Sequence, residues 1–333
     1  MKLGEKTYAR RFAVLIAVLL VAVIGSVMLG RYSITPAELV QTLFGGGDAG
    51  TKKVLFEIRL PRIAAALLIG AALSAAGVCY QGMFRNPMVS PDILGASTGA
   101  GFGAALAILL GIGYFGICLT AFIFGLLAVL LAYLVSRFGK TNETVAMILA
   151  GMVVSALFSA GTSFLKLVAD TQQQLPAITY WLMGSLASVK VRDLLFLAIP
   201  FVIGFVPLIL LRWRINLLTV GEAEAQAMGV NTGLLRLVVV LCATLLTASS
   251  VAVSGMIGWV GLIIPHFCRM LFGCDYRRLL PATALFGAAF LLIVDDIARL
   301  AATSEIPIGI LTAVVGAPIF LYLIVTGGKR NAD

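Results

Sequence analysis

The segment RIAAALLIGAALSAAGVCYQGM, residues 62–83, decides the fold of this chain. It begins with the charged Arg62 and continues to Met83 almost entirely in apolar or small residues. A helix of about 20 such residues is what the hydrocarbon core of a bilayer requires. The glycines and alanines within it would let neighbouring helices approach closely. The segment therefore predicts a transmembrane helix that packs against others.

Segments of the same kind fill most of the 333 residues, of which 61% are apolar and only 12% are charged. A soluble domain carries about 25% charged residues, so lipid must be the main solvent of this chain. We predict one all-α, polytopic transmembrane helical bundle over residues 1–333, with ten spans. The predicted spans are residues 10–30, 62–83, 93–111, 114–136, 144–167, 193–211, 237–254, 257–272, 280–300 and 308–326.

The basic residues indicate the topology. With the N-terminus in the cytoplasm, most of the 24 Lys and Arg residues fall in cytoplasmic segments, as the positive-inside rule expects. An even number of spans then leaves both termini in the cytoplasm. The apolar run Phe12–Leu29 is longer than the core of a signal peptide, which predicts a retained first helix. The net charge of +9 follows largely from this bias and needs no nucleic-acid partner.

Two segments are interrupted by Gly and Pro at membrane depth. They are Gly77–Gly103 and Gly255–Arg269, and they occupy comparable places in the two halves of the chain. Such pairs indicate internal repeats around a substrate path, because a broken helix needs protein or water to satisfy its backbone. The repeat would be inverted, since the two halves start their spans from opposite sides.

A short cytoplasmic helix is predicted near residues 220–230, between the sixth and seventh spans. Glu222 and Glu224 would lie in its first turn, where the helix dipole favours anions, and Gly229 is a natural stop. The helix is either a plain surface helix or a docking element for a motor subunit. The chain itself has no Walker A motif, because Leu134 occupies the first glycine position before Gly139–Thr141. If ATP drives transport, a separate subunit must bind and hydrolyse the ATP.

Two sets of motifs follow one another along the chain. The first set comprises Glu57–Arg62, Gly70–Leu73, Gly77, Gln81, Arg85–Pro87, Pro91, Leu94–Gly95 and Gly99–Ala100. The second set comprises Gly255–His266, Arg269, Leu280–Pro281, Asp296, Arg299, Glu305–Gly309 and Gly316–Pro318. From about residue 55 onward the chain closely resembles the FecCD-type permease family of type II ABC importers. Members of that family carry ferric siderophores, haem and cobalamin.

The resemblance implies a homodimer in the cell inner membrane, with two ATP-binding ABC subunits below it and one extracytoplasmic substrate-binding protein above it. It implies ATPase-coupling residues Gly221, Glu222, Ala223, Ala225, Met228 and Gly229. It implies that Arg59, Arg62 and Arg299 dock acidic residues of the binding protein, and that Asn86, Met88 and Thr144 form a cytoplasmic gate. The translocation path and the family motif would include Gly77, Gln81, Arg85, Pro87, Gly95, Gly99, Gly258, Gly261, Pro265 and His266.

Each assignment has a plainer alternative. The arginines could anchor the chain at the membrane interface, and Arg299 could pair with Asp295 at an i,i+4 spacing. Asp295 and Asp296 could form a proton relay, which would favour an ion-coupled secondary transporter, but pairing with Arg299 near the interface is the preferred interpretation. The gate turn could be an ordinary Asn–Pro turn, and a lone His266 is more often a structural donor than a ligand.

The chain is not expected to be an enzyme or to hold a cofactor or a metal. One histidine cannot build a multi-His site, the five cysteines are scattered, and no cluster of His, Asp or Glu faces the cytoplasm. The predicted function is permease-mediated import of an iron chelate such as a siderophore, or of haem or cobalamin. The sequence leaves the cargo open, including oxyanions such as molybdate.

Overall fold

The computed structural model describes residues 5–30, 32, 34–138 and 143–327. In these ranges every regular element is a helix. The first half contains α1 (Glu5–Met28), α2 (Pro36–Leu43), α3 (Ala49–Lys53), the π-helix η1 (Val54–Arg59), α4 (Leu60–Met83), the 3₁₀-helix η2 (Pro91–Leu94), α5 (Ala96–Leu109), α6 (Tyr114–Arg137) and α7 (Glu143–Val168). The second half contains α8 (Gln174–Met183), α9 (Val191–Val220), α10 (Glu222–Ala227), α11 (Thr232–Ser254), α12 (Val260–Phe272), α13 (Tyr276–Leu300) and α14 (Ile308–Gly327).

The ten predicted spans correspond to ten of these helices, which confirms the helical membrane bundle. Seven helical segments in the described residues are long and apolar enough to cross a membrane. The other three spans are the shorter apolar helices α5, α12 and α14. The bounds 93–111 and 257–272 started too early, because η2 and the irregular segment 255–259 precede α5 and α12. The sequence analysis did not foresee α8, which lies between the predicted fifth and sixth spans.

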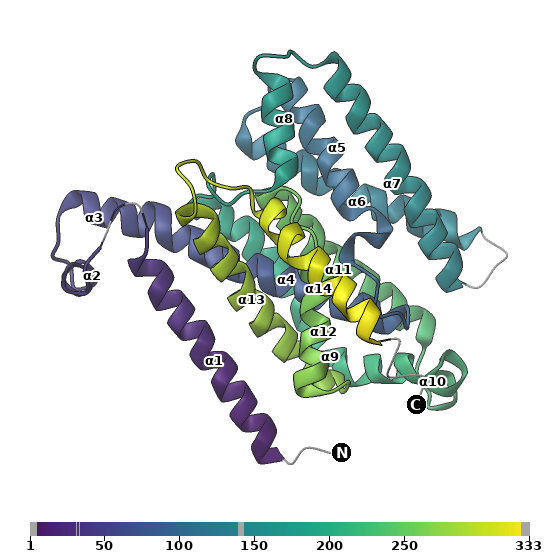
Figure 1. Ribbon diagram of the computed structural model, residues 1–333. Helices are drawn as coiled ribbons and strands as arrows, with labels where there is room; N and C mark the ends of the chain where they lie inside the picture. The colour runs from purple at the N-terminus through teal and green to yellow at the C-terminus, as the bar shows by residue number, and fades with distance from the viewer. Residues whose placement is uncertain (1–4, 31, 33, 139–142, 328–333) are drawn as a thin grey trace.

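The helix α4 occupies the centre of the molecule (Figure 1). In the continuous helical run that it ends, 83% of the most apolar stretch is buried, compared with 17% for α1 and for α9. It packs against α9, α11, α12 and α13. Such close packing requires small residues. A Cβ on Gly70 would lie 2.2 Å from the carbonyl oxygen of Gly287 on α13, so the two backbones are in direct contact.

The two ends of the bundle carry different accessory helices. The helices α2 and α3 project beside the C-terminal end of α1, whereas α10 lies at the end that also holds the start of α1 and the end of α14 (Figure 1). Thr35 caps α2 in a capping box with Glu38, and Pro36 occupies its first turn, as the sequence predicted. We name these two ends the α2 end and the α10 end.

Candidate functional site

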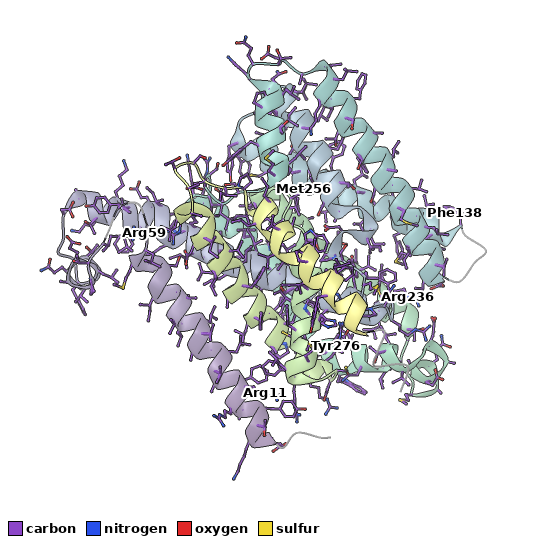
Figure 2. The ribbon with its side chains drawn as sticks, in the orientation of Figure 1. Arg11, Arg59, Phe138, Arg236, Met256 and Tyr276 are labelled. Carbon is purple, nitrogen blue, oxygen red and sulfur yellow. The ribbon has the colours of Figure 1, made fainter. Side chains whose placement is uncertain are left out.

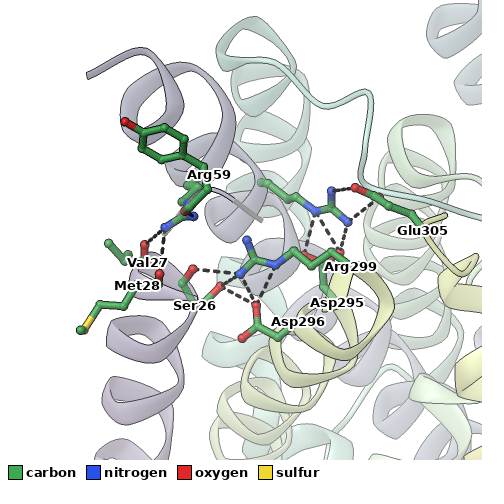
Figure 3. A network of polar contacts seen from close by, with 10 residues as sticks. Ser26, Val27, Met28, Arg59, Asp295, Asp296, Arg299 and Glu305 are labelled. Carbon is green, nitrogen blue, oxygen red and sulfur yellow. Dashed lines mark hydrogen bonds and ion pairs between the residues drawn. The ribbon is translucent and has the colours of Figure 1, made fainter. Parts of the chain in front are cut away.

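At the α2 end, Arg62 is the centre of a buried ionic cluster with Asp295 and Glu305, which are labelled in Figure 3. Its guanidinium group donates to both oxygens of Asp295 on α13 at 2.9–3.1 Å, and to both oxygens of Glu305 at 3.0 Å. The side chains of Arg62 and Asp295 are 8% and 1% exposed, whereas that of Glu305 is 28% exposed. The pair joins α4 to α13, and Glu305 attaches the connection before α14 to the same cation.

Arg299 belongs to a second cluster beside the first. It pairs with Asp296 and donates to the carbonyl oxygen of Ser26 at 2.9 Å and to its hydroxyl oxygen at 2.7 Å. The predicted pairing of Arg299 with Asp296 is confirmed, whereas its i,i+4 pairing with Asp295 was wrong. Asp296 is one residue, or about 100°, further around α13 than Asp295, so it faces α1 while Asp295 faces α4.

Arg59 lies next to these clusters, but its guanidinium group binds backbone carbonyl groups instead of a carboxylate. It donates to the carbonyl oxygens of Val27, Met28 and Tyr32, which close the end of α1. No carboxylate of the described residues lies within ion-pair distance of it. All three arginines predicted to dock a binding protein are thus buried, at 3–8% exposure, and are bonded within the chain. Their docking role stays a prediction.

A cavity of about 200 Å³ opens beside these arginines at the α2 end. Arg59, Arg62, Arg299 and Glu305 line it, together with apolar side chains from η1. The guanidinium groups are therefore buried but adjoin an accessible space. Arg62 and Arg299 are already paired with acids of the chain, so a carboxylate that entered this cavity would find Arg59 as the arginine without a carboxylate partner among the described residues.

At the α10 end, the predicted short helix is present over Glu222–Ala227. Gly229 adopts φ +78°, and the amide of Val230 donates to the carbonyl oxygen of Ala225 at 3.0 Å, which closes the helix with the turn that glycine favours. Ala225 is buried against the bundle, whereas Ala223 and Met228 are exposed. The helix thus presents one small face to the protein and the other to solvent.

An ion-pair cluster fixes α10 to the bundle. Arg236, 6% exposed on α11, binds Glu222 at 3.2 Å and also pairs with Glu143 at the start of α7. Thr232 donates to Glu222 at 3.3 Å and accepts from Gln226 at 3.0 Å. The sequence analysis missed this role of Arg236. The sequence does place a basic side chain directly before the predicted span 237–254. That position alone could not show that Glu143 and Glu222 are its partners.

The interrupted segments of the two halves meet at the centre of the bundle. A Cβ on Gly77 would lie 1.9 Å from the carbonyl oxygen of Gly261, and a Cβ on Gly261 would lie 2.6 Å from that of Leu73. One turn further along α4, Gln81 donates to the carbonyl oxygens of Val89 and Leu262 at 3.1 and 3.3 Å. Its own oxygen accepts from Arg269 at 2.5 Å. These residues hold two broken helices together.

The remaining family-motif residues have the following places. Gly95 ends η2 at φ +87°, Gly99 packs against the backbone of α6, and Gly258 has open space beside it. Pro265 is buried within α12, and His266 next to it is half-buried. Pro87 is exposed in the turn after α4, where Arg85 has φ +49°.

The predicted gate residues lie at the α10 end of two helices. Asn86 and Met88 follow α4, and the side-chain oxygen of Asn86 accepts from the amide of Met88 at 2.9 Å. Met88 is 55% exposed. Thr144 lies in the first turn of α7. The Asn86 contact is that of an ordinary turn, and the gate stays a prediction.

One further acid shapes the α10 end. Asp275 caps α13, accepting from the amide of Arg277 at 3.0 Å and from Asn216 at 2.7 Å. Partial burial acts to raise the pKa of Asp275, but these hydrogen bonds and the charges of Arg277 and Arg278 outweigh it and hold the pKa below its ordinary value.

No group of three or more His, Cys, Asp or Glu side chains suited to a metal ion occurs in the described residues. Four cysteines are buried and Cys274 is exposed, and all five are free thiols.

A family model, curated relatives and a solved structure all match this chain over most of its length. A model of the FecCD transport family matches residues 18–326. The molybdate import system permease protein of Haemophilus influenzae is 43% identical over 96% of this chain and 97% of its own length. The hemin transport system permease protein of Yersinia pestis is 37% identical over 96% of each chain. A solved structure, described as an inward-facing conformation of a metal-chelate type ABC transporter, matches with a TM-score of 0.87 and 42% identity, over 96% of this chain and 99% of that one.

Proposed function

Because the chain belongs to the FecCD transport family, we propose that it is the membrane subunit through which an ABC importer passes a metal-containing cargo into the cytoplasm. Two copies would form the path, two ATPase subunits would bind at the α10 end, and a binding protein would deliver cargo at the α2 end. The proposal places the chain in the inner membrane with both termini in the cytoplasm.

The exposed face of α10 is the observation that carries this proposal. The helix is short, closed by Gly229 at one end and fixed to α11 by the ion pair between Glu222 and Arg236. Its outward side chains include Ala223 and Met228, which is 60% exposed. Glu224 and Gln226 are exposed beside them, so a small face of mixed polarity is available to fit a groove on an ATPase subunit.

The proposed cargo is molybdate or a related oxyanion, with an iron chelate as the second candidate. The oxyanion comes first because the relative with 43% identity across nearly the full length is a molybdate permease. The iron chelate is supported by the metal-chelate type of the similar structure, and the hemin relative keeps haem on the list of cargoes to be tested.

Ion-coupled transport is the competing function, and its best support is weakened by the ionic clusters. Asp295 and Asp296 each have an arginine partner, so neither is an unpaired acid in the membrane.

Uptake into proteoliposomes tests the proposal. The vesicles would contain the chain, its ATPase and its binding protein, and would be offered molybdate, a ferric siderophore, haem and cobalamin with and without ATP. ATP-dependent accumulation of one cargo is expected. Accumulation that persists without ATP and stops with a protonophore would refute the ABC mechanism.

The docking of α10 has its own matched pair of variants. Met228→Gln should uncouple ATP hydrolysis from uptake, whereas Met270→Gln, at another exposed methionine near the same end, should leave coupling unchanged. If the two variants coupled ATP hydrolysis to uptake equally well, α10 would not be the contact with the ATPase.

A further inference from the structure

An apolar groove lies between α6 and α11, away from the residues considered so far. It has a volume of about 630 Å³, and its walls include Ile123, Leu127 and Leu130 from α6. Leu237 and Leu241 line the opposite wall on α11. Leu130 and Leu241 are 52% and 55% exposed, so the groove is open along its length to the surroundings of the bundle.

The groove continues into a polar pocket at the α10 end. The pocket has a volume of about 300 Å³ and is lined by Ser136, Arg137, Glu143 and Arg236, among others. Tyr133 lines both spaces, and the two share successive turns of the same two helices. Figure 2 shows Arg236 and the nearby Phe138 on the same side of the molecule. The apolar groove therefore ends in a pocket that is lined by charged side chains.

The dimensions of the two spaces fit one leaflet of a membrane. From Ile123 to Arg137 the α6 wall rises about 21 Å at about 1.5 Å per residue. Half of a hydrocarbon core is about 15 Å thick. The groove is thus long enough for the tail region of one leaflet, and the polar pocket falls at the depth of the headgroups.

The charges in the pocket have both signs and balance. Arg236 pairs with Glu143 and Glu222, so its own charge is neutralised. The guanidinium of Arg137 lies 6.0 Å from the ring centre of Tyr133 and has no carboxylate within ion-pair distance among the described residues. The side chain of Glu143 is 65% exposed, and one of its oxygens binds Arg236. The pocket therefore offers one accessible cation and one accessible anion.

We propose that the groove and pocket bind a zwitterionic aminophospholipid. An acyl chain would fill the groove, the phosphate would bind Arg137, and the primary ammonium would donate to Glu143. Arginine matches a phosphate with two parallel hydrogen bonds, and charge-assisted bonds of both kinds are strong. A choline headgroup lacks an N–H donor for Glu143, and a glycerol headgroup lacks the cation. Because lipid tails are as apolar as the groove, the headgroup decides which lipid is retained.

Native mass spectrometry of the purified chain tests this site. The chain would be reconstituted with equal amounts of phosphatidylethanolamine, phosphatidylcholine and phosphatidylglycerol that have the same acyl chains, and then extracted. Preferential retention of phosphatidylethanolamine is expected. Arg137→Ala should lower its occupancy about fivefold, the typical effect of one basic side chain at a headgroup. Arg214→Ala, at an exposed arginine near the same end of α9, is the control and should change nothing.

Two more variants separate the headgroup from the tail. Glu143→Gln should abolish the preference for ethanolamine over choline. Leu241→Trp should fill the groove and lower retention of all three lipids, and glycerophosphoethanolamine, which has no tails, should not compete. Equal retention of the three lipids, or a preference for phosphatidylglycerol, would refute the proposal. So would a change of oligomeric state in Leu241→Trp without a change in bound lipid, because a second copy of the chain would then cover the groove.

Discussion

Replacing Arg62 by methionine tests whether the cluster at the α2 end holds the bundle together. The substitution keeps most of the side-chain volume and removes the cation from between Asp295 and Glu305. Asp295 would then be a carboxylate with a 1% exposed side chain and no partner on α4. Loss of one member of a buried ion pair costs about 3–5 kcal/mol. Glu305 is partly exposed and can turn to water, so it should add about 1 kcal/mol or less.

The double variant Arg62→Met with Asp295→Leu separates the lost pair from lost packing. Both charges are then absent, and a buried ion pair replaced by apolar groups of similar volume is often neutral or even more stable. We therefore expect the double variant to recover most of the stability lost in Arg62→Met. The Gly70–Gly287 contact between α4 and α13 is untouched by either change.

The free energy of unfolding can be measured by reversible SDS titration in mixed micelles. Arg192→Met is the matched control, because Arg192 pairs with Asp193 at 3.8 Å through a side chain that is 57% exposed. The side chain of Asp193 is only 5% exposed, but it keeps a hydrogen bond from the amide of Lys190 at 2.9 Å, and a long ion pair with an exposed arginine contributes about 0–1 kcal/mol. If Arg62→Met were no more costly than Arg192→Met, or if the double variant were as unstable as the single one, the cluster would not hold α4 to α13.

Three further predictions concern single sites. Gly77→Ala should abolish folded protein in fluorescence-detected size exclusion, because its Cβ would overlap the carbonyl oxygen of Gly261, whereas Gly258→Ala has open space and should remain folded. Gly229→Ala should cost about 1 kcal/mol in the unfolding titration, because a left-handed residue with a Cβ is strained, and it should also lower coupling of ATP hydrolysis to uptake. Asp275 has a depressed pKa in the folded state, so its contribution to stability is complete above its unfolded pKa and is lost as pH falls through the folded value. Asp275→Asn should therefore flatten the decline of thermal stability in acid, and an unchanged acid profile would show that the cap does not matter.

The spans were predictable because each one needs a long apolar segment, whatever it packs against. The turn at Gly229 and the cap at Thr35 were predictable for a similar reason, since both depend on local backbone chemistry. The helix α8 was not foreseen, because its ten residues are too few to span a membrane.

The partners of the arginines could not be read from the sequence. Arg62 and Asp295 are 233 residues apart, and only the packing of α4 on α13 brings them together. A helical pattern offers Asp295 and Asp296 equally to Arg299, and the i,i+3 choice depends on where α1 lies. Ion pairs within a bundle can therefore be assigned only once the arrangement of the helices is known. The positions of the helices along the sequence can be predicted without knowing the ion pairs.

The same internal pairing bears on how this family can serve chemically different cargoes. In the described part of the membrane region, the cations Arg62, Arg236 and Arg299 are each committed to acids of the same chain. Arg269 contacts Gln81, although its Nη1 atom is buried without a partner. Charges that are neutralised within the scaffold cannot also select an anionic cargo. These three paired arginines are therefore poor candidates for distinguishing cargoes such as the molybdate and hemin of relatives of similar sequence.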